Sequence, residues 1–173
     1  MRKIISQKFF TRNGLVVARD LIGKYLIRKI GTKIYAHQII EVEVYDGPYD
    51  MASHASKGRT SRTEVMFGEG GCFYVYLVYG MHYMLNVVVD KKDYPAAILI
   101  RGVKKVSGPG RITKKLKINK NFNNKEAIPA NNMWFEDTGE RINRKNIKKT
   151  PRIGVSYAGP IWSKKLYRFL LKS

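Results

Sequence analysis

The sequence predicts an α+β fold with a curved, mainly antiparallel sheet, several short helices and a protruding β-hairpin, in a single domain over residues 1–173. Three observations indicate this fold. Runs of β-branched and aromatic residues recur along the chain, short turns separate neighbouring runs, and only brief segments have the spacing of an amphipathic helix. Because parallel neighbours need connections of a dozen or more residues, short turns favour antiparallel pairs.

The first half of the chain begins with a helix and a hairpin. A helix is expected at residues 11–22 (TRNGLVVARDLI), where apolar side chains recur on one stripe. Thr11 is the expected N-cap and Gly23 the stop. Strands are expected at residues 24–30 and 34–45, joined by a Gly-Thr turn.

Two further strands and a helical turn are expected in the middle. After the basic segment HASKGRTSR, a helical turn is expected near residues 62–67. The stretch at 71–89 (GCFYVYLVYGMHYMLNVVV) reads as two strands broken at Gly80, and AAILIRGV at 96–103 reads as another.

The last third is less regular. A helix entered through SGPGR is expected after Ser107, followed by a very basic loop at 141–149. Apolar patches are found at residues 133–135, 153–157 and 166–171.

The charge balance points to a polyanionic partner. The chain has 33 Lys and Arg against 13 Asp and Glu, for a net charge of +20. Nucleic acid, an acidic membrane surface and acidic protein are the candidates. No apolar run approaches the roughly 18 residues of a spanning helix, and the N-terminus lacks the apolar stretch of a signal peptide, so the membrane is disfavoured and an intracellular protein is expected.

Cysteine and histidine give no sign of a disulfide or a metal site. Cys72 is the only cysteine, which excludes an internal disulfide and agrees with a reducing compartment. The three histidines, His37, His54 and His82, are too far apart in sequence for a zinc motif. No metal is therefore expected.

The segment EVEVYDG places two carboxylates close together in this basic chain. Alternate side chains of a strand share a face, so Glu41, Glu43 and Tyr45 are expected on one face, opposite Ile40, Val42 and Val44. A solvated strand face is the ordinary explanation of such a pair. A carboxylate beside aromatic side chains is also what a general base needs, because partial desolvation keeps its proton affinity useful at neutral pH.

Other polar and aromatic residues could carry function. Tyr74 and Tyr76 could be core aromatics, whereas Tyr79, at a hairpin tip, is expected to be exposed and could insert into a base stack. Arg101 could pair with a glutamate or hold a phosphate. Asn86, inside an apolar strand, either bonds to backbone or faces a pocket.

Cations are concentrated in two places, and together they could neutralise a run of phosphates. These residues are Lys57, Arg59, Arg62, Lys104, Lys105, Arg111, Lys114 and Lys115. GPGR at 108–111 lacks the length and the Lys-Ser/Thr ending of a P-loop, so nucleotide triphosphate binding is not supported.

Residues 41–89, followed by LIRGV, SGPGRITKKLKI and RIGVSYAGP, resemble the alkyladenine (3-methyladenine) DNA glycosylase family. The resemblance covers nearly the whole chain and is carried by E-x-E-x-Y, H-x-x-x-G-R-T and Y-V-Y-x-x-Y-G-M. It implies a monofunctional enzyme that flips damaged purines out of duplex DNA from the minor groove and leaves an abasic site. It also implies a monomer with no metal and no organic cofactor.

The resemblance implies roles for individual residues. Glu43 is implied as the general base for the attacking water, supported by Arg101. The flipped base would lie in a pocket whose residues are Tyr45, His54, Tyr76 and Asn86, the last of which excludes guanine's amino group. Contacts to DNA would come from Tyr79 as the wedge, from Gly80 and Met81 beside it, and from Arg59 and Arg62.

The sequence departs from the family pattern near the basic segment. Many relatives have Ala where Val44 stands, and Pro-Arg-Asn where Ser61, Arg62 and Thr63 stand, and Glu64 adds an acid. These differences bear on phosphate contacts and loop rigidity.

Two other classes of function stay open from the residues alone. A non-catalytic nucleic-acid-binding module would use the same aromatics and cations without breaking a bond. An enzyme acting on free nucleosides is disfavoured, because a small substrate does not require a charge of +20.

Overall fold

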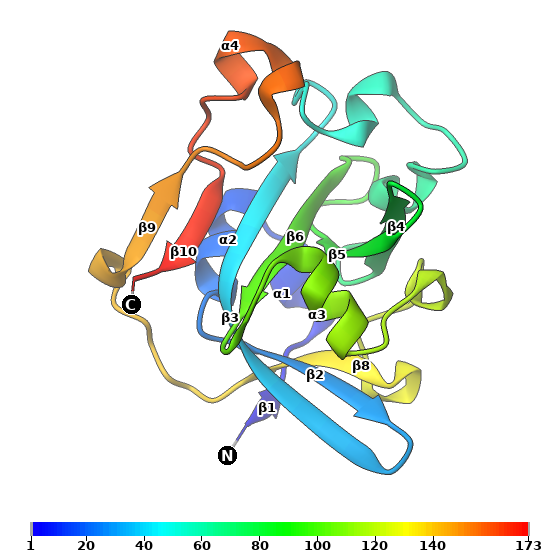
Figure 1. Cartoon of the computed structure of the whole chain (residues 1–173), viewed down its shortest axis with the longest axis vertical. Coiled ribbons are helices and arrows are strands. Elements are labelled where there is room, and N and C mark those ends of the chain that lie inside the picture. Colours follow the sequence, from blue (N-terminus) through cyan, green and yellow to red (C-terminus); the bar gives the residue numbers. More distant parts are fainter. Residues whose placement is uncertain (1, 173) are drawn as a thin grey trace.

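The computed structural model describes residues 2–172, and it has the predicted α+β fold with a mainly antiparallel sheet (Figure 1). The strands are β1 Lys3–Ile4, β2 Tyr25–Ile30, β3 Lys33–Asp46, β4 Phe73–Val78, β5 His82–Val88, β6 Ala96–Val103, β7 Val106–Ser107, β8 Met133–Asp137, β9 Ile147–Thr150 and β10 Arg168–Leu171. The helices are α1 Gln7–Phe10, α2 Gly14–Leu21, α3 Pro109–Lys115 and α4 Gly159–Trp162, with 3₁₀ turns η1 His54–Lys57, η2 Glu64–Phe67, η3 Lys120–Phe122, η4 Pro129–Asn131, η5 Arg144–Asn146 and η6 Ser156–Ala158.

The sheet is organised around β3. Its main path runs β1-β8-β2-β3-β6-β5-β4, and all the named pairs are antiparallel. The first half of β3 pairs with β2, and the second half lies between β6 and β10. Figure 1 shows α3 crossing one face of the sheet and α2 lying on the other. One long strand therefore connects the two ends of the molecule.

A bulge between β3 and β6 interrupts the regular alternation of buried and exposed side chains that was predicted for β3. Ile39 pairs with Val103, Glu41 with Gly102, and Val42 with Ile100, so each strand contains one extra residue. In consequence the core contains Ile39, with Val42 and Val44, and the expected Ile40 is only partly buried. Arg101 is the extra residue on β6, next to Glu41 and free of a strand partner.

Three local predictions were also wrong or incomplete. The helix α2 begins at Gly14, because the side chain of Asn13, rather than Thr11, accepts hydrogen bonds from the first turn. Helix α1 was not predicted at all. The loop expected at 141–149 ends in β9, which pairs with β10.

The main core fills the space between the sheet and the helices α1, α2 and α3. Phe10, Leu21, Phe73, Ile98 and Ile112 are among its buried side chains. A smaller cluster under η1 and η2 supports the aromatic residues of β4. None of the helices in residues 2–172 combines the length and the apolar character that crossing a bilayer would require.

Candidate active site

Glu43 lies completely buried in β3, with a relative exposure of 0%. Its Oε2 accepts a hydrogen bond from the Tyr45 hydroxyl at 3.0 Å. Its Oε1 accepts one from the backbone N–H of Ile153 at 2.8 Å and lies 3.5 Å from Arg101 Nε. The carboxyl group is therefore held in one orientation by groups from three separate segments.

The environment of Glu43 suits proton transfer. Burial raises the pKa of the Glu43 carboxyl above its ordinary value, while Arg101, the Ile153 N–H and the Tyr45 hydroxyl oppose the rise. A raised pKa makes the ionised group a better proton acceptor than a solvated carboxylate. The sequence placed Glu43 on a solvated face or in a catalytic site, and full burial excludes the first.

Glu41 lies on the same strand but has different partners. Its Oε1 accepts hydrogen bonds from Arg101 Nε at 3.0 Å and from Arg168 Nε at 2.7 Å. Two guanidinium groups therefore compensate this carboxylate. Because Arg101 Nε points at both glutamates, Glu41 fixes the cation that faces Glu43.

A small pocket lies beside Tyr45, the residue whose hydroxyl donates to Glu43. It is lined by residues of β3, η1 and the loop before it, η2, β4, β5, β6 and η6, namely Tyr45, Ala52, Ser53, His54, Met66, Tyr74, Tyr76, Asn86, Ala97 and Tyr157. Its volume is ≈ 40 Å³, close to the share of one water molecule in the liquid, about 30 Å³.

The aromatic rings of the pocket contact one another. The His54 ring lies edge-on to Tyr76, with centroids 4.7 Å apart, and Tyr74 lies 5.2 Å from Tyr76. His54 Nδ1 is 3.1 Å from the Tyr74 hydroxyl. Burial, followed by the positive charges of Arg62 and Lys57, lowers the pKa of His54 to about 4. The imidazole is therefore neutral at pH 7 and does not repel a cationic base.

Asn86 lies in the pocket wall with its nitrogen already engaged. Its Nδ2 donates to the backbone oxygen of Tyr74 at 3.0 Å and to that of Met84 at 3.4 Å. The two alternatives given by the sequence, a backbone partner and a pocket position, are both true of this residue.

The expected wedge residues lie at the β4–β5 turn. Tyr79 is 89% exposed, and its φ of +51° together with the positive φ of Gly80 makes the tight turn. Met81, next along, is exposed as well. The turn therefore presents two large apolar side chains to solvent, which is what a base-stack wedge requires.

Arg59 and Arg62 differ in their surroundings. Arg59 is paired with Glu64 and Asp93 and lies over the Phe67 ring, so its charge is already compensated. Arg62 lies at 5.1 Å over the ring of Tyr76, which is one of the pocket residues. Of the two predicted phosphate contacts, the geometry favours Arg62.

Thr63 reinforces the loop that carries both arginines. Its hydroxyl donates to the backbone oxygen of Gly58 at 2.9 Å and accepts from the backbone N–H of Thr60 at 2.8 Å. Thr63 is one of the residues that depart from the family pattern, and its hydrogen bonds make this loop more rigid.

Sequence reasoning missed three residues of the site. Tyr157 lines the pocket mouth and donates a hydrogen bond to the Ala52 oxygen at 2.9 Å. Asp50 and Arg152 form an ion pair with both side chains 0% exposed, and Arg152 Nη2 lies 2.8 Å from Asp50 Oδ1. The motif RIGVSYAGP was the only sequence signal for Tyr157 and Arg152, and none distinguished Asp50.

The buried ion pair joins the segments around the site. Arg152 Nη1 donates to the Val44 oxygen at 2.7 Å, and its guanidinium lies 4.9 Å over the Tyr45 ring. Asp50 accepts from the backbone N–H groups of Asp46 and Ala52. The pair therefore holds the end of β3, the loop before η1 and the segment that donates to Glu43. Among residues 2–172, no three His, Cys, Asp or Glu side chains converge as a metal site would need.

A buried carboxyl group beside an aromatic pocket, in a strongly basic protein, defines an enzyme that acts on the bases of nucleic acid. Comparison with known proteins narrows the class. A family model described as Methylpurine-DNA glycosylase (MPG) matches residues 8–108 and 104–173. The chain belongs to this family. It is a DNA glycosylase, and its substrate is DNA with damaged bases.

Curated relatives agree over nearly their full length. A protein of Legionella pneumophila (strain Paris) is 39% identical, over 99% of this chain and 96% of its own. One of Methanocella arvoryzae is 39% identical over 90% and 86%, and one of Myxococcus xanthus 38% over 97% and 90%. Each is named "Putative 3-methyladenine DNA glycosylase". Membership in a glycosylase family decides against a non-catalytic binding module.

Proposed function

We propose that the protein is a monofunctional DNA glycosylase that flips alkylated or deaminated purines, such as 3-methyladenine and hypoxanthine, out of duplex DNA. It hydrolyses the N-glycosidic bond and leaves an abasic site for base excision repair, acting as a monomer from the minor groove, with the DNA inside the cell. The observation that carries the proposal is the buried Glu43 carboxyl, hydrogen-bonded to the Tyr45 hydroxyl at 3.0 Å beside the aromatic pocket.

In the proposed reaction, Glu43 is the general base. It takes a proton from a water molecule as the water oxygen forms a bond to C1′ of the deoxyribose. The bond between C1′ and the purine nitrogen breaks, and its electron pair leaves with the base. Arg101 keeps the Glu43 carboxyl oriented, and its guanidinium can also contact a nearby phosphate.

The proposed pocket favours purines that carry a positive charge. Tyr45, His54 and Tyr76 would stack on the flipped base, and electron-rich rings attract a cationic one. An alkylated purine of this kind also leaves readily as a neutral molecule. Hypoxanthine is neutral, so its departure needs a hydrogen bond or a proton on the leaving base.

A panel of oligonucleotide duplexes, each with one defined lesion, tests this function under single-turnover conditions. We expect hot alkali to break the lesion strand only at the lesion, with 3-methyladenine released fastest among the tested bases. Without alkali the strand stays intact, because the enzyme leaves an abasic site. Absence of alkali-dependent breaks for every alkylated and deaminated purine would rule the proposal out.

Tyr79→Ala tests the wedge at the β4–β5 turn. Flipping costs a few kcal/mol, and an aromatic side chain that fills the vacated stack returns about 1–3 kcal/mol. We expect excision from duplex DNA under subsaturating conditions to fall by roughly 5- to 150-fold. The measurement is the single-turnover rate constant against enzyme concentration.

A single-stranded lesion substrate is the control for Tyr79→Ala. A base in a single strand has no stack to refill, so the variant should lose little activity on it. An equal loss on both substrates would show that Tyr79 acts other than as a wedge.

A further inference from the structure

Acidic residues are absent from several long stretches of the chain, residues 141–173 among them, and two of these stretches meet in the fold. Residues 21–40 and 94–125 hold thirteen Lys and Arg and no Asp or Glu. The first stretch contains the β2–β3 hairpin, and the second contains β6, β7 and α3. The charge of this protein is therefore strongly segregated, which single solvated cations do not require.

Most cations of these stretches lie exposed and uncompensated; the exceptions are Lys24 and Arg101, which pair with acids, and Arg28, which is buried. Within residues 2–172, no ion pair is formed by the residues of what we call the basic face, which are Lys29, Lys33, Lys104, Lys105, Arg111, Lys114, Lys115 and Lys117. Elsewhere, arginines such as Arg12, Arg59 and Arg168 are paired with acids. A uniformly positive surface is complementary to a polyanion.

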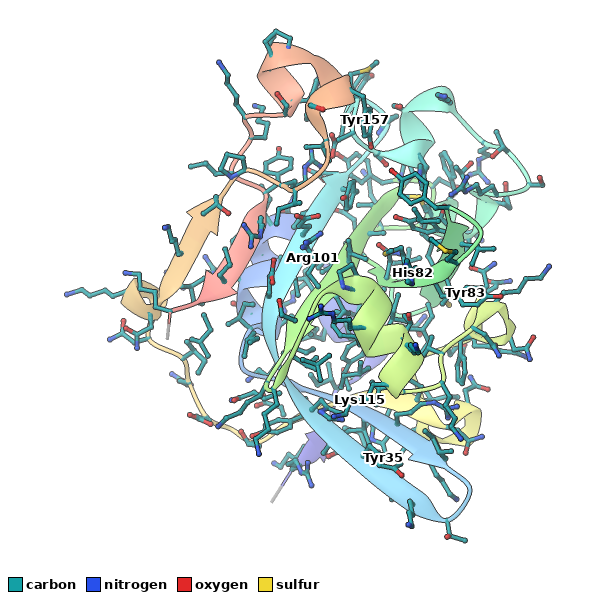
Figure 2. The ribbon with its side chains drawn as sticks, viewed as in Figure 1. Tyr35, His82, Tyr83, Arg101, Lys115 and Tyr157 are labelled. Carbon is teal, nitrogen blue, oxygen red and sulfur yellow. The ribbon has the colours of Figure 1, made fainter. Side chains whose placement is uncertain are left out.

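Helix α3 connects the β4–β5 hairpin to the β2–β3 hairpin. In its second half, Thr113 Oγ1 donates to the oxygen of Tyr83 in β5 at 2.9 Å. At its end, Arg28 Nε donates to the Leu116 oxygen at 3.1 Å. Figure 2 shows Arg101, His82, Tyr83, Lys115 and Tyr35 on one face, in a path from the site to the β2–β3 hairpin.

The length of β3 sets the reach of this face. Glu43 and Tyr35 are eight residues apart on the same strand, which corresponds to at most about 26 Å at about 3.3 Å per residue. Duplex DNA rises about 3.4 Å per base pair, so this distance matches about eight base pairs. The hairpin is therefore too far away to contact the flipped base and well placed to contact the flanking backbone.

The tip of the β2–β3 hairpin has side chains suited to that contact. Ile34 and Tyr35 are exposed beside Lys33. Phosphate oxygens commonly accept hydrogen bonds from lysine and tyrosine.

We propose that α3 and the β2–β3 hairpin bind the sugar-phosphate backbone of duplex DNA on one side of the lesion, out to about eight base pairs from it. The inference rests on the proposed function, because it takes the lesion strand to be held at Glu43 and Tyr79. The face adds affinity and register, and it takes no part in bond cleavage.

The test compares Lys29→Ala/Lys33→Ala/Lys115→Ala with a control triple, Lys8→Ala/Lys145→Ala/Lys148→Ala, whose lysines are exposed on α1, η5 and β9. Four lesion duplexes are used. The shortest has about five base pairs on each side of the lesion, and the other three add about ten base pairs on the 5′ side, on the 3′ side, or on both. Equilibrium Kd is measured at several salt concentrations.

We expect one of the two single extensions to strengthen binding by the wild-type protein at least tenfold, and the other to do little. The basic-face triple should lose that gain, with a salt slope smaller by about 2.7 on the long duplex. It should match the wild type on the short duplex and in the excision rate at saturating enzyme. The control triple should keep the gain.

Three results would overturn the inference. These are equal gains from both extensions, equal weakening of short and long duplexes by the basic-face triple, and an equal effect of the control triple. Failure of the proposed function is distinguishable, because a protein that excises nothing from the short duplex can still be assayed for its length-dependent binding.

Discussion

Glu43→Gln is expected to lower the single-turnover excision rate by about 10²- to 10⁴-fold, the usual contribution of a general base. The glutamine oxygen can still accept the hydrogen bond that the Ile153 N–H donates to Glu43. The amide cannot take a proton from water. Affinity for lesion-containing duplex should therefore stay within a few-fold of the wild type, which gel or fluorescence titration measures.

The same substitution has a signature in pH. Because burial raises the pKa of Glu43 in the folded protein above its ordinary value of 4.5, wild-type excision should rise with pH through that higher pKa. The rise should be absent in Glu43→Gln. A lesion that stays cationic across the range keeps the substrate from adding its own inflection.

Glu43→Gln should lower excision but should not lower the stability of the fold. A carboxyl group whose folded pKa is raised stabilises the fold fully below its unfolded pKa, and that contribution is lost as pH rises through the folded pKa. The neutral glutamine avoids this loss. At pH 7, Glu43→Gln should therefore melt at the wild-type temperature or above it.

Glu41→Gln is the comparison for this prediction. It makes the same chemical change on the same face of β3, where the carboxylate is bound by Arg101 and Arg168. Without a carboxylate at position 41, Arg101 is held less firmly beside Glu43. Excision should therefore fall, but by less than it does in Glu43→Gln. Wild-type excision by Glu43→Gln, or a larger loss in Glu41→Gln, would reject Glu43 as the base.

The fold was largely predictable because its strands are locally encoded. Aromatic and β-branched residues mark β4, β5 and β6, and glycine turns mark the hairpins. The bulge in β3 was not predictable, because Ile39 and Ile40 are equally apolar and only the pairing with β6 decides which one is buried. Strand β9 is polar, and it exists because β10 provides a partner.

The site was predictable where its residues are close in sequence. Glu43 and Tyr45 share a strand face, and their hydrogen bond follows from that spacing. Long-range pairs gave no local signal. Arg59 reads as a free cation until Asp93 is brought beside it. The same holds for Asp50 and Arg152, which are 102 positions apart.

That last pair bears on catalysis as well as on folding. Arg152 is the neighbour of Ile153, whose N–H donates to Glu43, and its guanidinium contacts the Tyr45 ring. Removing one partner from a fully buried pair leaves an uncompensated charge, which costs about 3–5 kcal/mol. Replacing both partners with neutral groups avoids most of that cost.

Asp50→Asn is therefore expected to lower the free energy of unfolding by about 3–5 kcal/mol, as measured by denaturant titration. Asp50→Asn/Arg152→Met should recover much of that loss without recovering excision, because the contacts of Arg152 with the Val44 oxygen and the Tyr45 ring are gone. In Asp50→Asn, assayed at a temperature where it is folded, the positive charge of Arg152 acts on Glu43 without the compensating Asp50 carboxylate, so the pKa of Glu43 should fall and the midpoint of the pH–rate curve should move downward. A merely structural pair would change stability and leave that midpoint where it is, and an unchanged free energy of unfolding would show that the pair contributes nothing to the fold. The direction follows from charge, because loss of the Asp50 carboxylate leaves Arg152 as an uncompensated cation within electrostatic reach of Glu43, and a nearby cation favours the ionised carboxylate.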